Sequence, residues 1–292
     1  MNLGRVGIWA FLDAPPAPQV RDIAAELEAL GYGALWVPET VGRDPFVLAE
    51  MLLASTSTMK VATGIASIWA RDSVTMSSTS KTLGEGHPGR FVLGLGVSHA
   101  RMVEGIRGRE YRTPLATMRA YLDAMDTAFY TGPVPEPPVP RILAALGPRM
   151  LALARDRADG AHPYFTTPEH TAVARDVLGE GPLLAPEQTV VVSDDPDEAR
   201  QVARGFASGY LGLPNYANNL RRLGFTEDDI EGVSDRVVDA TIAWGKPDTI
   251  RARVLAHLDA GADHVCVQVL PHEPGTVPLD AWRELAGALV DL

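Results

Sequence analysis

Residues 91–96 read Phe91-Val92-Leu93-Gly94-Leu95-Gly96, an apolar run of strand type that ends in two spaced glycines. Glycines after a strand are part of the fingerprint of a dinucleotide-binding open sheet, which also needs a third glycine and a helix that opens at once. No third glycine stands at the required spacing here, and no helical pattern opens immediately. Of the two common α/β architectures, this run therefore favours a barrel over a doubly wound open sheet.

On both sides of this run, short apolar segments alternate with longer segments of helical period. This alternation is typical of βαβ units and a parallel sheet. We expect strands over residues 4–10, 34–38, 60–68, 91–96, 141–145, 160–163, 188–192 and 264–270. The main expected helices are 18–30, 45–55, with Asp44 as cap, 74–86, 114–130, 149–157 and 280–289. Eight such strands predict a (β/α)₈ fold of the TIM-barrel type.

The 292 residues are expected to form a single domain. The proline-rich stretch 132–140 has the composition of a linker, but a strand and a helix resume after it, so we interpret it as a stiff loop within one barrel. Residues 209–246 are longer than one helix requires. We expect them to be an inserted helical segment before the last strand, placed so that it could cap the active site.

Composition and charge exclude several kinds of partner. The formal net charge is −11, which argues against nucleic acid because such binders concentrate Lys and Arg. No apolar run approaches the roughly 18 residues that span a bilayer, so no membrane is expected. Cys266 is the only cysteine and lies in an apolar strand, which indicates a buried thiol and a cytoplasmic location.

Several segments, in order along nearly the whole chain, resemble the luciferase-like monooxygenase superfamily, and especially its branch of F420-dependent oxidoreductases. They are Gly33-Ala34-Leu35-Trp36-Val37-Pro38-Glu39, Thr63-Gly64-Ile65-Ala66-Ser67-Ile68-Trp69, Arg90 to Val97, Ala158-Asp159-Gly160 and Ala260-Gly261-Ala262-Asp263-His264-Val265. The resemblance implies coenzyme F420 as cofactor, FMN as the alternative, and a homodimer acting on a small molecule.

The ends of the second and third strands are the first candidate cofactor contacts. The resemblance implies that Glu39 lies near the cofactor ring and that Ser67 and Ile68 belong to a bulge with a non-proline cis peptide, at residues 66–69, supporting the face of the ring. Relatives often place a histidine after the acidic residue, whereas this chain has Thr40. A base at that position is therefore missing.

The turn after the fourth strand supplies the candidate catalytic groups. Gly96 lets the backbone approach a planar ring, and Ser98 can donate a hydrogen bond. Some relatives carry a carboxylic acid just after this glycine, where this chain has Val97. We therefore expect His99 to be the general acid, with Glu39 as a second catalytic candidate.

Two further segments are expected to hold the rest of the cofactor. Gly147 and Arg149 stand where a helix begins, and free N–H groups with a fixed positive charge favour a phosphate. Gly160, Ala161 and His162 end the next strand, and the resemblance implies that they skirt the cofactor tail.

Trp69, Arg43 and Tyr164 are the candidate substrate pocket, with Arg43 facing an anionic substrate or the cofactor. Because strand ends converge at one mouth of a barrel, these distant residues could all touch one ligand.

The reaction predicted from these residues is hydride transfer between F420 and a small carbonyl, alcohol or activated alkene. An FMN-dependent two-component monooxygenase is the first alternative. A second is a metal-dependent isomerase or hydrolase using Glu39, His99, His162 and His272, although no local pair of ligands is present and we expect no metal. A third is a barrel that binds its ligand without turnover.

Overall fold

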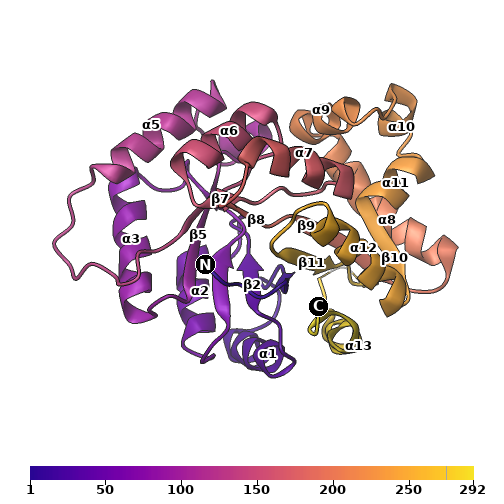
Figure 1. Cartoon of the computed structure of the whole chain (residues 1–292), viewed down its shortest axis with the longest axis horizontal. Helices are drawn as coiled ribbons and strands as arrows, with labels where there is room; N and C mark the ends of the chain where they lie inside the picture. Colours follow the sequence, from indigo (N-terminus) through magenta and orange to yellow (C-terminus); the bar gives the residue numbers. More distant parts are fainter. Residues whose placement is uncertain (274) are drawn as a thin grey trace.

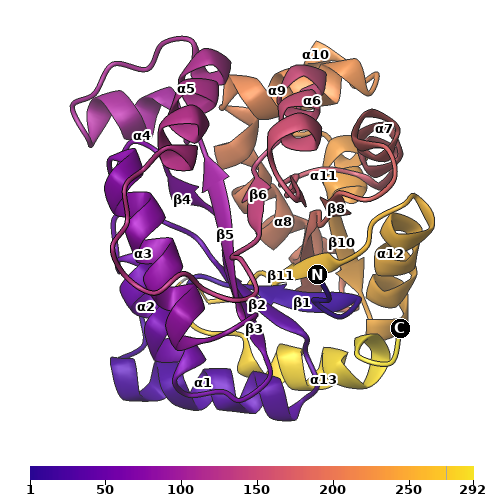
Figure 2. The same cartoon turned by 60° about the vertical axis from the view of Figure 1, so that its left-hand side comes forward.

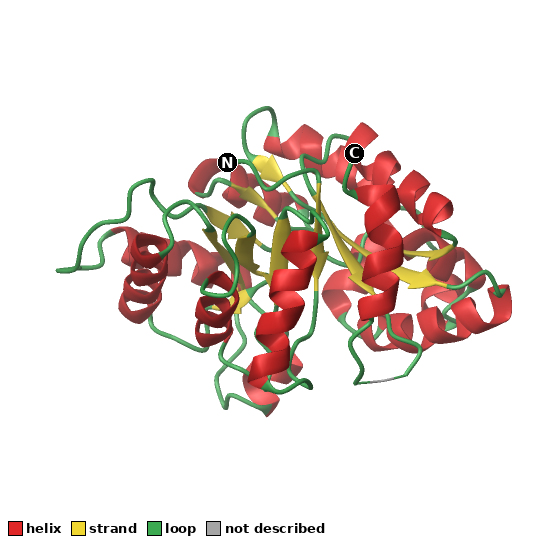
Figure 3. Cartoon of the chain, turned by 90° about the horizontal axis from the view of Figure 1, so that it is seen from below, coloured by secondary structure: helices red, strands yellow, loops and turns green. Residues whose placement is uncertain are grey.

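The computed structural model describes residues 1–273 and 275–292 and places a parallel sheet at the centre of the chain. Figure 3 shows the strands in the interior and helices around them. Every strand pair among the described residues is parallel. The strands are β1 (Val6–Trp9), β2 (Ala34–Val37), β3 (Lys60–Thr63), β4 (Ala66–Ser67), β5 (Phe91–Gly96), β6 (Arg141–Leu143), β7 (Gly160–Ala161), β8 (Leu183–Leu184), β9 (Glu187–Val192), β10 (Ile242–Gly245) and β11 (Val265–Val269).

The ring of strands closes through one continuous segment, residues 183–192. Its first half, β8, pairs with β7, and the Ala185 N–H donates to the Ala161 carbonyl at 2.9 Å. Its second half, β9, pairs with β11, which in turn pairs with β1. From β1 the order runs through β2, β3, β5 and β6 back to β7. The predicted TIM-barrel fold is confirmed.

The expected strand 60–68 is interrupted. It forms β3 and β4, and the non-proline cis peptide lies between them, at Gly64–Ile65, rather than at 66–69. β3 pairs with the first half of β5, whereas β4 pairs with its end, Ser67 opposite Gly96. The interruption therefore brings Ser67 to the rim of the barrel at the carboxyl end of β5.

Helices cover the outside of the barrel (Figure 1). They are α1 (Ala17–Ala29), α2 (Pro45–Leu53), α3 (Ser73–Gly86), α4 (Ala100–Gly105), α5 (Pro114–Asp126), α6 (Pro148–Arg157), α7 (Pro168–Leu178), α8 (Pro196–Leu211), α9 (Pro214–Arg222), α10 (Glu227–Glu231), α11 (Asp235–Thr241), α12 (Pro247–Asp259) and α13 (Leu279–Leu289). The expected helix 114–130 ends earlier, at Asp126, and α4 was not predicted because its six residues carry too short a periodic pattern.

Residues 209–246, expected as an inserted helical segment, comprise the end of α8, the short helices α9, α10 and α11, and the strand β10. β10 pairs with β9 on the edge away from β11. The sequence did not predict this strand, because Ile242-Ala243-Trp244-Gly245 follows a helix directly with no turn residue between them. In Figure 2, α6 and α9 are both drawn over one end of the barrel.

The inside of the barrel holds buried histidines among apolar side chains. The ring of His162 stacks on Trp36, with centroids 4.5 Å apart, and the Trp36 indole donates to Nε2 of His264 at 3.2 Å. Outside the barrel wall, the Nε2 of His257 is 2.9 Å from Oε1 of Gln188. Burial lowers the pKa of His162 and His264 to about 4 and that of His257 to about 3.

These histidines are expected to make stability fall as the pH is lowered from about 6.5 toward 4. Between these pH values the histidines are protonated in the unfolded chain but stay neutral in the folded protein. The free energy of unfolding therefore rises with pH. Glu187 acts in the opposite direction, because burial raises its pKa to about 7 and the folded protein keeps a proton that the unfolded chain has released. We expect a net slope of about 2–3 kcal/mol per pH unit near pH 5.5.

Urea unfolding at half-unit steps from pH 7 to pH 5 measures this slope, and Glu187→Gln provides the matched variant. Removing the opposing carboxyl should make the slope steeper by about 1 kcal/mol per pH unit. A free energy of unfolding that is flat between pH 6.5 and pH 5 in both proteins would contradict the assignment of neutral, buried histidines.

Candidate functional site

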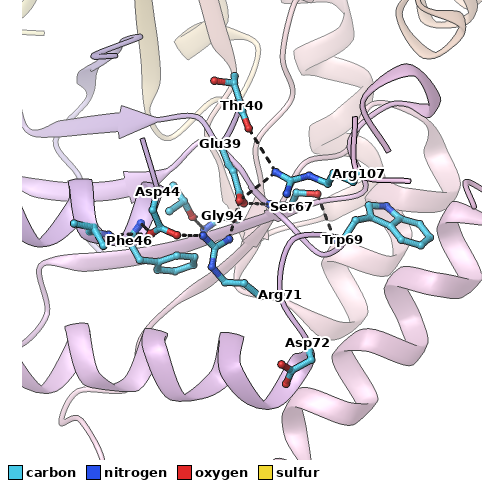
Figure 4. A network of polar contacts seen from close by, with 12 residues as sticks. Glu39, Thr40, Asp44, Phe46, Ser67, Trp69, Arg71, Asp72, Gly94 and Arg107 are labelled. Atoms are coloured by element: carbon cyan, nitrogen blue, oxygen red, sulfur yellow. Dashed lines mark hydrogen bonds and ion pairs between the residues drawn. The ribbon is translucent and has the colours of Figure 1, made fainter. Parts of the chain in front are cut away.

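Glu39 stands just beyond β2, at the mouth where the carboxyl ends of the strands meet, and its side chain is only 6% exposed. Its Oε2 accepts the Ser67 N–H at 2.8 Å. Its Oε1 accepts from Arg71 Nη1 at 2.8 Å and from Arg107 Nη2 at 3.3 Å, and Figure 4 shows the carboxylate between the two guanidinium groups. Because a buried carboxylate needs such partners, this side chain ties β2 to β4 and to the segment after α4.

The Arg71 guanidinium joins the end of β4 to α2. It pairs with Asp44 as well as Glu39, and it lies 4.8 Å from the centre of the Phe46 ring. Burial opposes the charge of Arg71, but the two carboxylates outweigh it and raise the pKa of this guanidinium. Asp44 also accepts the N–H groups of Phe46 and Val47, so the predicted cap of α2 is confirmed.

A pocket of about 730 Å³ opens beside this network. Residues 39–44, 69–71, 106, 107 and 109 line it, so three loops contribute: those after β2, β4 and α4. It brings together Glu39, Arg43 and Trp69, which were predicted from the sequence. It adds three arginines that sequence reasoning missed, Arg71, Arg107 and Arg109, since an arginine in a loop carries no pattern that marks it as part of a site.

Arg43 is at the pocket wall, but its guanidinium is held by the protein. It donates to the carbonyl oxygens of Leu12 and Pro15, and its backbone N–H donates to Asp13 Oδ1 at 2.7 Å. These contacts therefore stabilise the β1–α1 loop. A direct contact between Arg43 and an anionic ligand stays a prediction.

The rim of the barrel at β5 gathers the other predicted ring contacts. The Ile68 N–H donates to the Gly96 carbonyl at 3.1 Å, and the Trp69 indole donates to the Val97 carbonyl at 2.9 Å. A Cβ on Gly96 would lie 2.5 Å from the side chain of Ile65, so a larger residue at this position would require the Ile65 side chain to shift. Ser67, Ile68 and Gly96 thus lie side by side at the rim, next to Glu39.

His99 follows β5 and reaches the inserted segment. Its ring centroid is 5.5 Å from that of Tyr216 on α9, and its side chain hydrogen-bonds Asn215. Burial lowers the pKa of His99, an effect only partly offset by the Asn215 hydrogen bond. The imidazole is therefore neutral at pH 7. Ser98, beside it, has a positive φ of 54° and accepts the Tyr111 hydroxyl through its carbonyl at 3.2 Å.

Tyr164 lies in a cluster of aromatic hydroxyl groups at the barrel mouth, outside the arginine-lined pocket. Its hydroxyl donates to Gln268 Oε1 at 2.6 Å and is 3.0 Å from the Tyr210 hydroxyl. Tyr164 and His99 share Tyr216 as a neighbour, with ring centroids 6.2 Å apart for the Tyr164 pair. Tyr210 and Tyr216 were missed because both belong to the inserted segment, whose packing has no signal in sequence.

The predicted phosphate site is the open N-terminus of α6. Gly147 is the N-cap residue and no side chain caps the helix, while Arg149 is exposed in the first turn. The inserted segment adds a second guanidinium: Arg222 Nη2 is 3.8 Å from the position that a Cβ on Gly147 would take. Free N–H groups with one or two guanidinium groups nearby are the donor set that a phosphate monoester or diester needs.

Gly160, Ala161 and His162 lie within the barrel wall and its interior. A Cβ on Gly160 would be 2.2 Å from the Leu183 carbonyl, which explains the glycine by packing alone. His162 is 1% exposed, and its Nδ1 donates to the Ala185 carbonyl at 2.7 Å. None of the three offers exposed surface to a ligand in this structure, and their contact with a cofactor tail stays a prediction.

Within residues 1–273 and 275–292, no three His, Cys, Asp or Glu side chains are grouped so that they could hold a metal ion. The four residues considered for a metal site, Glu39, His99, His162 and His272, thus do not form such a group. No helix in the described part of the chain combines the length and apolarity needed to cross a membrane.

Comparison with known proteins gives a consistent match. A family model described as luciferase-like monooxygenase matches residues 4–264. The chain is 25% identical to a putative coenzyme F420-dependent oxidoreductase of Mycobacterium tuberculosis, over 91% of this chain and 94% of that protein. It is also 25% identical to the 5,10-methylenetetrahydromethanopterin reductase of Methanolobus tindarius, over 87% of this chain and 91% of the relative.

Solved structures share the fold. The F420-dependent tetrahydromethanopterin reductase from Methanopyrus kandleri superposes with a TM-score of 0.79 at 18% identity, covering 99% of both chains. An F420-dependent secondary alcohol dehydrogenase, solved with an F420-acetone adduct, gives a TM-score of 0.78 at 14% identity and covers 98% of both chains. At these identities the likeness concerns the fold alone.

Proposed function

The chain belongs to the luciferase-like monooxygenase family, and from this premise we propose that it is an oxidoreductase dependent on coenzyme F420. The observation that carries the proposal is the match, over nearly the full length of both proteins, to a relative whose name states F420 dependence.

The residues of this chain fit such a cofactor at two places. Ser67, Ile68 and Gly96 lie side by side at the rim of the barrel, where a flat ring would pack against them, and Glu39 lies next to them. The open N-terminus of α6, with Arg149 and Arg222, fits the phosphate of the cofactor tail. When bound, the deazaflavin supplies a carbon that carries hydride, so the protein mainly positions the substrate and manages one proton.

We propose that the substrate is a small carbonyl, alcohol or activated alkene and that His99 manages the proton. Since burial lowers the His99 pKa, the ring is unprotonated at pH 7 and can accept a proton from an alcohol as hydride leaves. Glu39 is less suited to that role, because both of its oxygens already accept hydrogen bonds. Its part is to hold Arg71 and Arg107 in place.

FMN is the alternative cofactor, in a two-component monooxygenase that receives reduced flavin. A Baeyer–Villiger monooxygenase solved with FMN shares this fold, with a TM-score of 0.73 at 16% identity. Because FMN also carries a phosphate, the N-terminus of α6 suits either cofactor, and binding has to distinguish them.

Titrating the purified protein separately with F420 and FMN, followed by cofactor absorbance and tryptophan quenching, tests the proposal. We expect F420 to bind at least about tenfold more tightly than FMN. Arg222→Gln and Arg149→Gln should each weaken F420 binding about tenfold, the effect of losing one charge-assisted hydrogen bond. Arg221→Gln is the matched control on α9, because Arg221 pairs with Glu227 instead. Tighter binding of FMN would favour the monooxygenase, and binding of neither would contradict both.

Cytoplasmic location and homodimer formation are also proposed, on the lone buried thiol of Cys266 and on family resemblance. Sedimentation of the purified protein measures the second.

A further inference from the structure

The pocket beside Glu39 concentrates positive charge in an acidic protein. Four of its lining residues are arginines and two are carboxylates, Glu39 and Asp44, whereas the whole chain has a formal net charge of −11. A local excess of this sign within a concave site raises the local concentration of anions. Binding of an anion requires that some of the four guanidinium groups keep free donors.

Two of the arginines already bind other groups of the protein. Arg71 pairs with both carboxylates, and Arg43 donates to two backbone carbonyls of the β1–α1 loop. The two positive charges of Arg43 and Arg71 equal the two negative charges of Glu39 and Asp44, so the local excess of positive charge comes from Arg107 and Arg109.

The other two arginines keep most of their donors. Arg107 makes only long contacts, 3.3 Å to Glu39 Oε1 and 3.5 Å to the Thr40 carbonyl, both from Nη2. Arg109 has no side-chain hydrogen bond or ion pair within residues 1–273 and 275–292, and it lines the same pocket. Each guanidinium has five N–H donors in a planar fork that matches a carboxylate, so an acid group could be held between them.

The pocket wall also carries large apolar side chains. Val41 is 69% exposed and Ile106 is 57% exposed, and both line the pocket with Trp69. An anionic group at Arg107 and Arg109 would therefore have apolar surface next to it for the body of the same molecule.

We propose that this pocket binds the carboxylate of an organic acid with an apolar body, Arg107 and Arg109 holding the acid group and Val41, Ile106 and Trp69 contacting the body. The acid is the substrate of the oxidoreductase, and only this last step rests on the proposed function. The binding itself needs no cofactor.

Hexanoate and 1-hexanol are the probes, because they share an apolar body and differ in charge. The ¹H–¹⁵N spectrum of the cofactor-free protein resolves tryptophan indoles, and Trp69→Phe assigns the Trp69 signal. We expect hexanoate to shift that signal with a saturable titration curve and to bind at least tenfold more tightly than 1-hexanol. Affinity should fall as salt is raised. Equal shifts by the two probes, or none, would overturn the proposal.

Variants locate the acid group. Arg107→Gln and Arg109→Gln should each weaken hexanoate binding about tenfold. Arg112→Gln is the control in the same segment: Arg112 is 78% exposed, pairs with Glu110 and does not line the pocket. Arg112→Gln should leave the affinity for hexanoate within twofold of that of the original chain. Unchanged binding in both pocket variants, with each folded by circular dichroism, would overturn the assignment.

A titration with F420 separates the two sources of an acid group, because F420 itself carries phosphate and carboxylate groups. If the pocket serves the substrate, Arg109→Gln leaves the F420 dissociation constant within twofold of the original chain while hexanoate binding falls. If F420 binding falls tenfold as well, the arginines hold the cofactor tail and the substrate proposal is wrong. Failure of F420 to bind at all would contradict the proposed function but leave the hexanoate result unaffected.

Discussion

Replacing Glu39 by glutamine is expected to lower the free energy of unfolding by about 3 kcal/mol, the lower end of the cost of breaking a buried ion pair from one side. The carboxylate is 6% exposed and is the only acidic partner of Arg107 among the described residues. Glutamine fills the same space and can still accept the Ser67 N–H, so the loss isolates the charge. Urea unfolding of both proteins at pH 7 measures it.

Asp44→Asn is the matched control for this experiment. Asp44 also pairs with Arg71, but its side chain is 43% exposed, and asparagine caps a helix as well as aspartate does. Asp44→Asn should therefore lower the free energy of unfolding by less than about 1 kcal/mol, as for surface ion pairs. If the two substitutions cost the same, the exposed pair of Arg71 with Asp44 contributes as much as the buried contacts of Glu39, and Glu39 is not the centre of the network.

The order of strands and the barrel could be predicted from the sequence because they rest on local patterns. Apart from β3 and β8, each strand of the ring is a short apolar run with a helix after it, and Asp44 marks a helix start by its own chemistry. β10 could not be predicted, because pairing between Ile242–Gly245 and β9 depends on how the inserted segment folds back onto the barrel. The split of residues 60–68 also depends on a neighbour, since β4 exists only through its pairing with β5.

The site was predictable where a residue lies directly at a strand end. Glu39, Ser67 and Gly96 were placed at one rim from the sequence, and they are adjacent in the structure. Arg71 and Arg107 were not predictable, because their relation to Glu39 comes from loops that are 32 and 68 residues away along the chain. The neighbours of His99 belong to α9, whose position no local pattern specifies.

Replacing Gly94 by alanine is expected to lower the free energy of unfolding by about 3 kcal/mol or more, the upper end of the cost of overpacking. A Cβ at this position would lie 1.9 Å from the carbonyl oxygen of Thr63, a backbone atom of the neighbouring strand. The Thr63 hydroxyl also donates to the Gly94 carbonyl at 2.7 Å, so β3 and β5 cannot separate without losing that hydrogen bond. Urea unfolding and the yield of soluble protein measure the effect.

Gly209→Ala is the control, because its Cβ would meet no atom within 4 Å and the residue lies on the exposed side of α8. Removing a glycine from a helix should raise stability by up to about 1 kcal/mol, so the two substitutions have opposite signs. Thr63 is followed by the short segment that leads to Ser67, whose N–H donates to Glu39. Gly94→Ala should therefore also weaken F420 binding, whereas a stable Gly94→Ala protein with unchanged affinity would show that the rim is not held by the close packing of β3 on β5.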